Sequence, residues 1–137
     1  MVTGFAGSNS LVPVLGVGVR VPQDVQEANV FRLAEATCEH MGIPGAVKRE
    51  QVVANCNYIG KGYGFPAKST IEAIELLART EGILLDPVYS GKGFAGLVDL
   101  VRQGHFKAGE NVVFVHTGGS QALFGYREAF NLPKYTG

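Results

Sequence analysis

The sequence predicts an α/β fold, a parallel sheet covered by helices on both faces. Short apolar runs alternate four times with segments whose apolar residues recur at helical spacing. This alternation is typical of βαβ units, whose buried parallel strands form nearly continuous apolar runs. We find no internal repeat, linker or low-complexity tract, so the 137 residues are expected to form a single segment of one domain.

The first strand and helix are predicted within the first 45 residues. Residues 12–19 (VPVLGVGV) are apolar and rich in valine, which favours a buried strand. Pro22 and Asp24 suit the start of a helix, and Gly42 with Pro44 is expected to end it. Most of its apolar residues fall on one face: Val25, Ala28, Val30, Phe31, Ala34 and Met41.

The remaining elements follow the same logic. Ser69 with Glu72 forms a capping-box pattern that opens a helix, and Gly82 is expected to end it. Another helix is predicted over residues 92–103, before Gly104. The other expected elements are strands at residues 52–54, 83–85 and 111–115, and a last helix from Ser120 to about Phe130. Residues 1–7 read as the final turns of a helix without its beginning, which suggests truncation.

Composition and charge exclude several classes of protein. Twelve basic and twelve acidic residues give zero net charge and no basic stripe, so no nucleic-acid partner is expected. No apolar run approaches the roughly 20 residues needed to span a bilayer, and no signal peptide is apparent. Cys38 and Cys56 are expected to be free thiols in a reducing cytoplasm. The three histidines show no metal-ligand spacing, so no metal site is predicted.

Three predicted loops should meet at the carboxyl edge of the sheet, where open parallel sheets bind ligands. They carry Tyr63, Tyr89 with Ser90, and Thr117 with Gly118. The phenols suit proton transfer or carboxylate binding, the hydroxyls suit a ring nitrogen, and the glycines allow close approach of backbone to a ligand. From spacing alone, packing roles for the tyrosines and a structural role for His116 remain open. Lys61 and Lys92 are expected to be solvated.

Three segments resemble one enzyme family. They are GYGFP at 62–66, EGILLDPVYSGKGFAGLVDLV at 81–101 and VVFVHTGGSQALFGY at 112–126. They look like the D-cysteine desulfhydrase and 1-aminocyclopropane-1-carboxylate deaminase family, whose fold is that of the tryptophan synthase β-subunit. The resemblance implies a partial large domain of a fold type II enzyme that uses pyridoxal 5'-phosphate.

The resemblance also implies roles for individual residues. Tyr63 and Tyr89 match the two tyrosines that face the substrate and are the predicted catalytic residues. Ser90, Thr117 and Gly118 are the predicted cofactor-binding residues. Ser90 replaces the glutamate, and Thr117 the leucine, of the deaminase branch. A hydroxyl beside the ring nitrogen leaves the ring closer to neutral, which favours β-elimination from D-cysteine or L-cysteate over ring opening. The deaminase remains the alternative.

Parts of the family pattern are not found in this sequence. The Gly-Asn-Lys segment that carries the cofactor lysine, the phosphate loop and the N-terminal small domain have no counterpart among the 137 residues. The resemblance therefore implies a C-terminal portion that is inactive without the missing half. Its expected partner is a second copy, in a homodimer of the complete enzyme, or a separate N-terminal half. A non-catalytic interaction module and a generic anion- or nucleotide-binding domain are the other interpretations. Exposed apolar surface around residues 12–19 is expected to reduce solubility.

Overall fold

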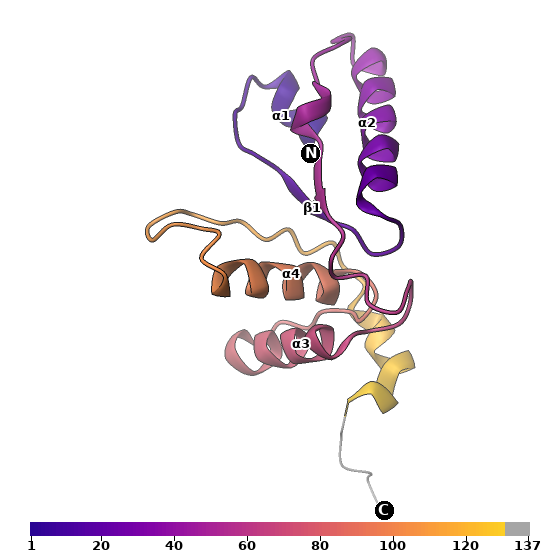
Figure 1. Ribbon diagram of the computed structural model, residues 1–137, viewed down its shortest axis with the longest axis vertical. Helices are drawn as coiled ribbons and strands as arrows, with labels where there is room; N and C mark the ends of the chain where they lie inside the picture. Colours follow the sequence, from indigo (N-terminus) through magenta and orange to yellow (C-terminus); the bar gives the residue numbers. More distant parts are fainter. Residues whose placement is uncertain (131–137) are drawn as a thin grey trace, which may run out of the picture. The chain divides into compact units, whose positions relative to one another are not determined.

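The computed structural model describes residues 1–130 and has an α/β architecture with parallel strands, as predicted (Figure 1). These residues divide into two compact units, Met1–Cys56 and a second that begins at Asn57. The expectation that the whole chain belongs to one large domain stays a prediction.

The first unit contains a two-stranded parallel sheet and its helices. Strands β1 (Leu15–Val17) and β2 (Val53–Asn55) pair in the register Leu15 with Val53, Gly16 with Ala54 and Val17 with Asn55. The connection between them holds α2 (Gln23–His40) and the 3-10 turn η1 (Arg49–Gln51), and α1 (Val2–Gly7) precedes β1. A parallel pair needs such a crossover, because the chain must return to the edge at which it started.

The core of this unit lies against one face of α2. Ala34 and Cys38, one helical turn apart, are buried with Val47 and Val52. Val30 and Phe31 are half-buried against this cluster, so three of the six residues of the predicted apolar face, with Ala34, are confirmed. Val25, Ala28 and Met41 are exposed instead, and Val25 and Met41 lie at the ends of the helix, beyond the cluster. Cys38 was missing from the predicted face.

An ion pair ties the helix to the second strand. The Glu27 carboxylate accepts a hydrogen bond from Arg49 Nη2 at 2.9 Å and from the backbone N–H of Ala54 at 3.0 Å. The hydrogen bond from Arg49 is the main cause of a lowered pKa of the Glu27 carboxyl, with those from Ala54 and Gln23 adding to it. Glu27 therefore fixes β2 against α2 through a charged hydrogen bond.

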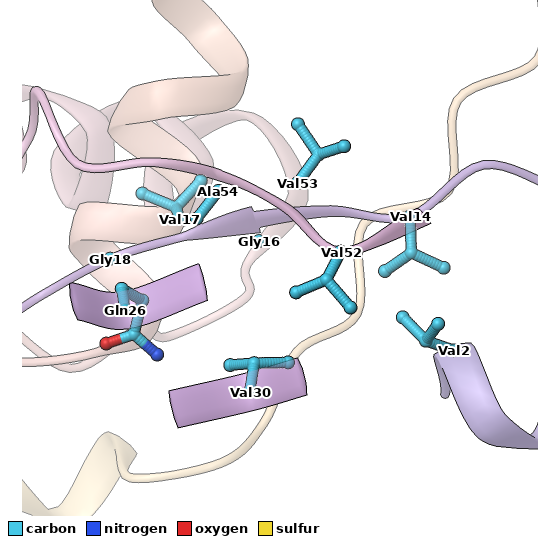
Figure 2. A pocket seen from close by; sticks show the side chains of 10 residues that line it. All are labelled: Val2, Val14, Gly16, Val17, Gly18, Gln26, Val30, Val52, Val53 and Ala54. Carbon is cyan, nitrogen blue, oxygen red and sulfur yellow. The ribbon is translucent and has the colours of Figure 1, made fainter. Parts of the chain in front are cut away.

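The first unit also has a shallow hollow beside β1 and β2, lined mainly by valines (Figure 2). Val30 and Val52 approach each other across it from the helix and the strand region. Its volume of about 100 Å³ is well below the roughly 300–1,000 Å³ typical of ligand pockets. Leu11, Val12 and Leu15 are exposed nearby, Leu11 to 94%. This is the exposed apolar surface expected from the sequence.

The second unit is built on two helices that lie side by side, α3 (Lys68–Glu81) and α4 (Ser90–Arg102) (Figure 1). Gly82 ends α3 in the left-handed conformation at φ 68°, as predicted. The segment between the helices carries Leu85, which is fully buried. The 3-10 helix η2 (Ser120–Ala129) follows a long extended segment.

Several predicted elements differ in the structure. Residues 83–85 and 111–115 are extended but form no strand, and only residues 15–17 of the predicted strand 12–19 pair. A strand requires a hydrogen-bonded neighbour, and within residues 1–130 only β1 and β2 have one. β1 is largely exposed rather than buried. The capping box is wrong, because α3 begins one residue before Ser69 and is capped by Ala67 without a side-chain hydrogen bond.

Two further searches cover the same residues. Across residues 1–130, every helix is too short or too polar to cross a bilayer. In that range no three His, Cys, Asp or Glu side chains gather as metal ligands would.

Candidate functional site

Two phenols separated by 26 residues meet in the second unit. The hydroxyls of Tyr63 and Tyr89 are hydrogen-bonded, with ring centroids 5.8 Å apart and the rings inclined at 66°. Both side chains remain about half exposed. The structure therefore brings together the two predicted catalytic residues and leaves them accessible to solvent. Their catalytic roles stay a prediction.

The turn that carries Tyr63 is shaped by its glycine neighbours. Gly62 and Gly64 adopt φ 141° and 80°, conformations that side chains disfavour. The Tyr126 hydroxyl donates to the Gly64 carbonyl at 2.8 Å, so η2 also holds this turn. The glycine spacing visible in the sequence is thus required by the backbone itself.

A buried lysine fixes the segment before Tyr63. Lys92 is 0% exposed, and its ammonium donates to the carbonyl oxygens of Ile59 at 2.6 Å and Gly62 at 2.9 Å. Burial lowers the pKa of this ammonium. The expectation of a solvated lysine is wrong, because two loop carbonyls replace water around the charge. Lys92 therefore links the first turn of α4 to the segment that leads into Tyr63.

A buried carboxylate organises the start of α4. Asp86 is 0% exposed and accepts four hydrogen bonds, from the N–H groups of Val88, Tyr89 and Ser90 and from Ser90 Oγ, at 2.6–2.8 Å. Burial opposes ionisation, but the hydrogen bonds outweigh it and lower the pKa of the Asp86 carboxyl. A carboxylate that precedes a helix and accepts from the N–H of its first residue also interacts favourably with the helix dipole. Asp86 thereby determines where Tyr89 and Ser90 lie.

Ser90 is the first residue of α4 and not part of a loop. It is buried, its hydroxyl bonds to the Asp86 carboxylate at 2.6 Å, and the same oxygen accepts from Asp86 N–H at 2.9 Å. Gly91 is also helical, and a Cβ there would lie 2.5 Å from the Asp86 carbonyl oxygen. The absence of a side chain at Gly91 therefore allows a close approach to the protein's own backbone.

The segment with Thr117 and Gly118 is held by His116. The His116 Nδ1 accepts from the Gly118 N–H at 3.0 Å, so the other ring nitrogen carries the proton and donates to the Leu84 carbonyl at 2.9 Å. His116 has the structural role left open by the sequence. Gly118 has open space where a Cβ would be, at φ 92°, and Thr117 is exposed. Among residues 1–130 the Thr117 hydroxyl has no hydrogen-bond partner.

The predicted residues are thus only partly gathered. Tyr63 and Tyr89 touch, and Ser90 adjoins them through Asp86. The Thr117 segment reaches the same carboxylate, because a Cβ on Gly119 would lie 3.0 Å from Asp86 Oδ1. Asp86 was not among the predicted site residues, yet an aspartate before a helix start is a known capping signal.

This donor set fits one side of an aromatic cofactor. Two phenols, a hydroxyl backed by a carboxylate, and a glycine with open space beside it suit a polar heteroaromatic ring. The set does not include a lysine for covalent attachment. Within residues 1–130, the Lys92 ammonium is buried against two carbonyls, and the other lysines are exposed.

Comparisons with known proteins agree with this chemistry. A family described as "Pyridoxal-phosphate dependent enzyme" matches residues 1–118. The chain is 39% identical over 130 residues to a protein of Burkholderia ambifaria (strain MC40-6), and 38% to one of Ralstonia pickettii (strain 12J), both named 1-aminocyclopropane-1-carboxylate deaminase. Each match covers 95% of this chain and 38% of the relative.

A solved structure gives the same result for the fold. The crystal structure described as an ACC deaminase homologue superposes with a TM-score of 0.80 at 31% identity, covering 93% of this chain and 38% of that one. The chain therefore spans less than two-fifths of the length of the proteins it matches.

Proposed function

We propose that this chain, which belongs to the family of pyridoxal-phosphate-dependent enzymes, forms the phenol-bearing side of the active site of a lyase that deaminates a small amino acid. The observation that carries the proposal is the hydrogen-bonded pair of Tyr63 and Tyr89 beside the carboxylate-supported Ser90. Pyridoxal phosphate, when bound, supplies an electron sink for the carbanion formed at the substrate α-carbon.

The residues of this chain would bind, orient and move protons. The Tyr63 and Tyr89 hydroxyls share a hydrogen bond, so one phenol can hold the proton that the other releases. Lys92 fixes the backbone next to Tyr63 through the Gly62 carbonyl, and Asp86 fixes the backbone of Tyr89 through its N–H. Ser90 and Thr117 would contact the cofactor ring, with Gly118 allowing backbone to approach it.

The first candidate substrate carries sulfur on its β-carbon, as D-cysteine or L-cysteate does. This candidate is supported by the hydroxyls of Ser90 and Thr117, which stand where the deaminase pattern has a glutamate and a leucine. Elimination from D-cysteine with water gives pyruvate, ammonia and sulfide. The second candidate is 1-aminocyclopropane-1-carboxylate, which the names of the relatives favour. Its deamination with water gives a four-carbon 2-oxo acid and ammonia.

The activity would require residues beyond those of this chain. The cofactor-binding lysine and the phosphate loop must come from an N-terminal portion, on one longer polypeptide or on a second one. A homodimer is the proposed assembly of the complete enzyme. Without that portion, the chain would act only as a non-catalytic interaction module.

The test is reconstitution. This chain is co-expressed with the N-terminal portion of the Burkholderia ambifaria relative, and the purified complex is given pyridoxal phosphate with D-cysteine, L-cysteate or the cyclopropane substrate. Cofactor absorbance and 2-oxo acid release are measured. We expect Tyr63→Phe and Tyr89→Phe to lower turnover strongly while keeping cofactor absorbance.

The matched control is Tyr58→Phe. Tyr58 lies in the same unit, but its hydroxyl bonds to Asp99 at 2.7 Å rather than to the phenol pair. This variant should keep full turnover. A complex that binds the cofactor yet releases no 2-oxo acid from any of the three substrates would reject the proposed reaction.

A further inference from the structure

The direction of the hydrogen bond between Ser90 and Asp86 is determined by the surrounding donors. Both carboxylate oxygens of Asp86 accept backbone N–H groups, Oδ2 from Val88 and Tyr89 and Oδ1 from Ser90. A carboxylate that accepts from three amides is stabilised in its ionised form, and an ionised carboxylate can only accept. The Ser90 hydroxyl must therefore donate its proton to Asp86 Oδ1.

The remaining capacity of the Ser90 oxygen can then be counted. A hydroxyl has one proton and two lone pairs. The proton is used by the Asp86 carboxylate, and one lone pair accepts from Asp86 N–H at 2.9 Å. One lone pair is left, so Ser90 can accept one more hydrogen bond but cannot donate one.

We propose that Asp86 is a positioning residue that makes Ser90 an acceptor-only partner for the pyridine nitrogen of the cofactor, so that the ring is held in its protonated form. This inference rests on the proposed function, in which Ser90 contacts the ring. A neutral pyridine nitrogen is itself an acceptor and would face the Ser90 lone pair without a proton between them. Only the N–H of a pyridinium satisfies both atoms.

The inference reverses the expectation drawn from Ser90 alone. A lone hydroxyl can donate to a neutral ring, which leaves a weak electron sink. Here the Asp86 carboxylate favours the protonated ring although it does not contact the ring. It acts through the Ser90 hydroxyl, which it turns into an acceptor. A protonated ring is the stronger electron sink, so Ser90 would not by itself exclude the cyclopropane substrate, and the preference for a sulfur-bearing substrate would rest on Thr117.

Asp86→Asn should invert this arrangement. The side-chain amide has one accepting oxygen and one donating NH₂ group. With the oxygen kept on the Val88 and Tyr89 amides, the NH₂ group takes the place of Oδ1, so it donates to Ser90 Oγ and the hydrogen bond from the Ser90 N–H is lost. The hydroxyl proton is then free to turn outward and to donate to a neutral ring nitrogen.

The experiment reads the protonation of the ring and not turnover. The reconstituted complex is loaded with pyridoxal phosphate labelled with ¹⁵N in the ring, at a pH where the ring nitrogen of the free cofactor is neutral. We expect the ¹⁵N resonance at the position of a pyridinium in the unmodified complex. It should move to the position of a neutral ring in Asp86→Asn.

Ser90→Ala is a second variant that keeps the three amide bonds of Asp86 and should also give a neutral ring. Ser69→Ala, which removes an exposed serine in the first turn of α3, is the matched control and should keep the pyridinium signal. A neutral ring in the unmodified complex, or a pyridinium that persists in Ser90→Ala, overturns the inference while leaving the proposed function intact. A complex without bound cofactor signal rejects the proposed function, and the inference with it.

Discussion

Replacing Gly91 by alanine tests the close packing that places Tyr89 and Ser90. A Cβ at position 91 would lie 2.5 Å from the Asp86 carbonyl oxygen and 2.8 Å from Ile74 Cδ1. That carbonyl already accepts the Gly91 N–H at 2.8 Å, so it cannot move away without losing the bond. The new methyl group must therefore displace backbone at the start of α4 or the facing side chain of α3.

Two opposing effects set the size of the change. Overpacking a tight site costs roughly 1–3 kcal/mol, whereas alanine gains up to about 1 kcal/mol over glycine within a helix. We expect Gly91→Ala to lower the free energy of unfolding by about 1–2 kcal/mol. At about 3–5 °C per kcal/mol for a chain of this size, the midpoint of thermal unfolding falls by several degrees.

Gly93→Ala is the matched control within the same helix. Its added Cβ would lie 3.5 Å from Phe114 Cε2, an ordinary contact, so only the gain in helix propensity remains. This variant should be more stable by up to about 1 kcal/mol. Thermal and urea unfolding followed by circular dichroism measure both. Equal stability of the two variants would refute the packing argument.

Three further outcomes are expected. The lowered pKa of Asp86 means that its contribution to stability is complete above its ordinary value of 3.8 and is lost as pH falls through the folded-state pKa; urea unfolding below pH 4 should show this loss, and Asp86→Asn should make it smaller, leaving the part due to Glu27. His116→Ala removes the acceptor of the Gly118 N–H, so hydrogen exchange at Gly118 should accelerate, while unchanged exchange would contradict the structural role of His116. Partial burial, with a smaller effect from the hydrogen bond to Asp99, raises the pKa of Tyr58 to about 12; a spectrophotometric titration should lose this late phase in Tyr58→Phe, and a midpoint near 10 would count against the half-buried pair of Tyr58 and Asp99.

The helices were largely predictable, because their signals are local. Apolar spacing located α2, α3 and α4, and Gly82 and Gly104 adopt the left-handed conformation close behind the helices they terminate. The strands were less predictable, because a strand depends on a partner that may be distant in sequence. Leu85 is buried as a strand residue would be, yet the segment around it has no paired neighbour within the described range.

The site shows the same division between local and distant information. The meeting of Tyr63 with Tyr89 followed from placing both loops at one edge, although the predicted four-stranded sheet did not form. The burial of Lys92 depends on the carbonyls of residues 59 and 62, some 30 positions away, and no helical pattern indicates this. The role of Lys92 therefore required coordinates, whereas the capping signal at Asp86 was local.

The burial of Lys92 has a consequence for cofactor chemistry. Aldehydes condense with amines through the nitrogen lone pair, and an ammonium enclosed by two carbonyls offers none. In the proposed site, a flexible amine two residues from Ser90 would compete for the aldehyde of the cofactor. By enclosing this amine, the fold would keep a competing nucleophile away from the phenols.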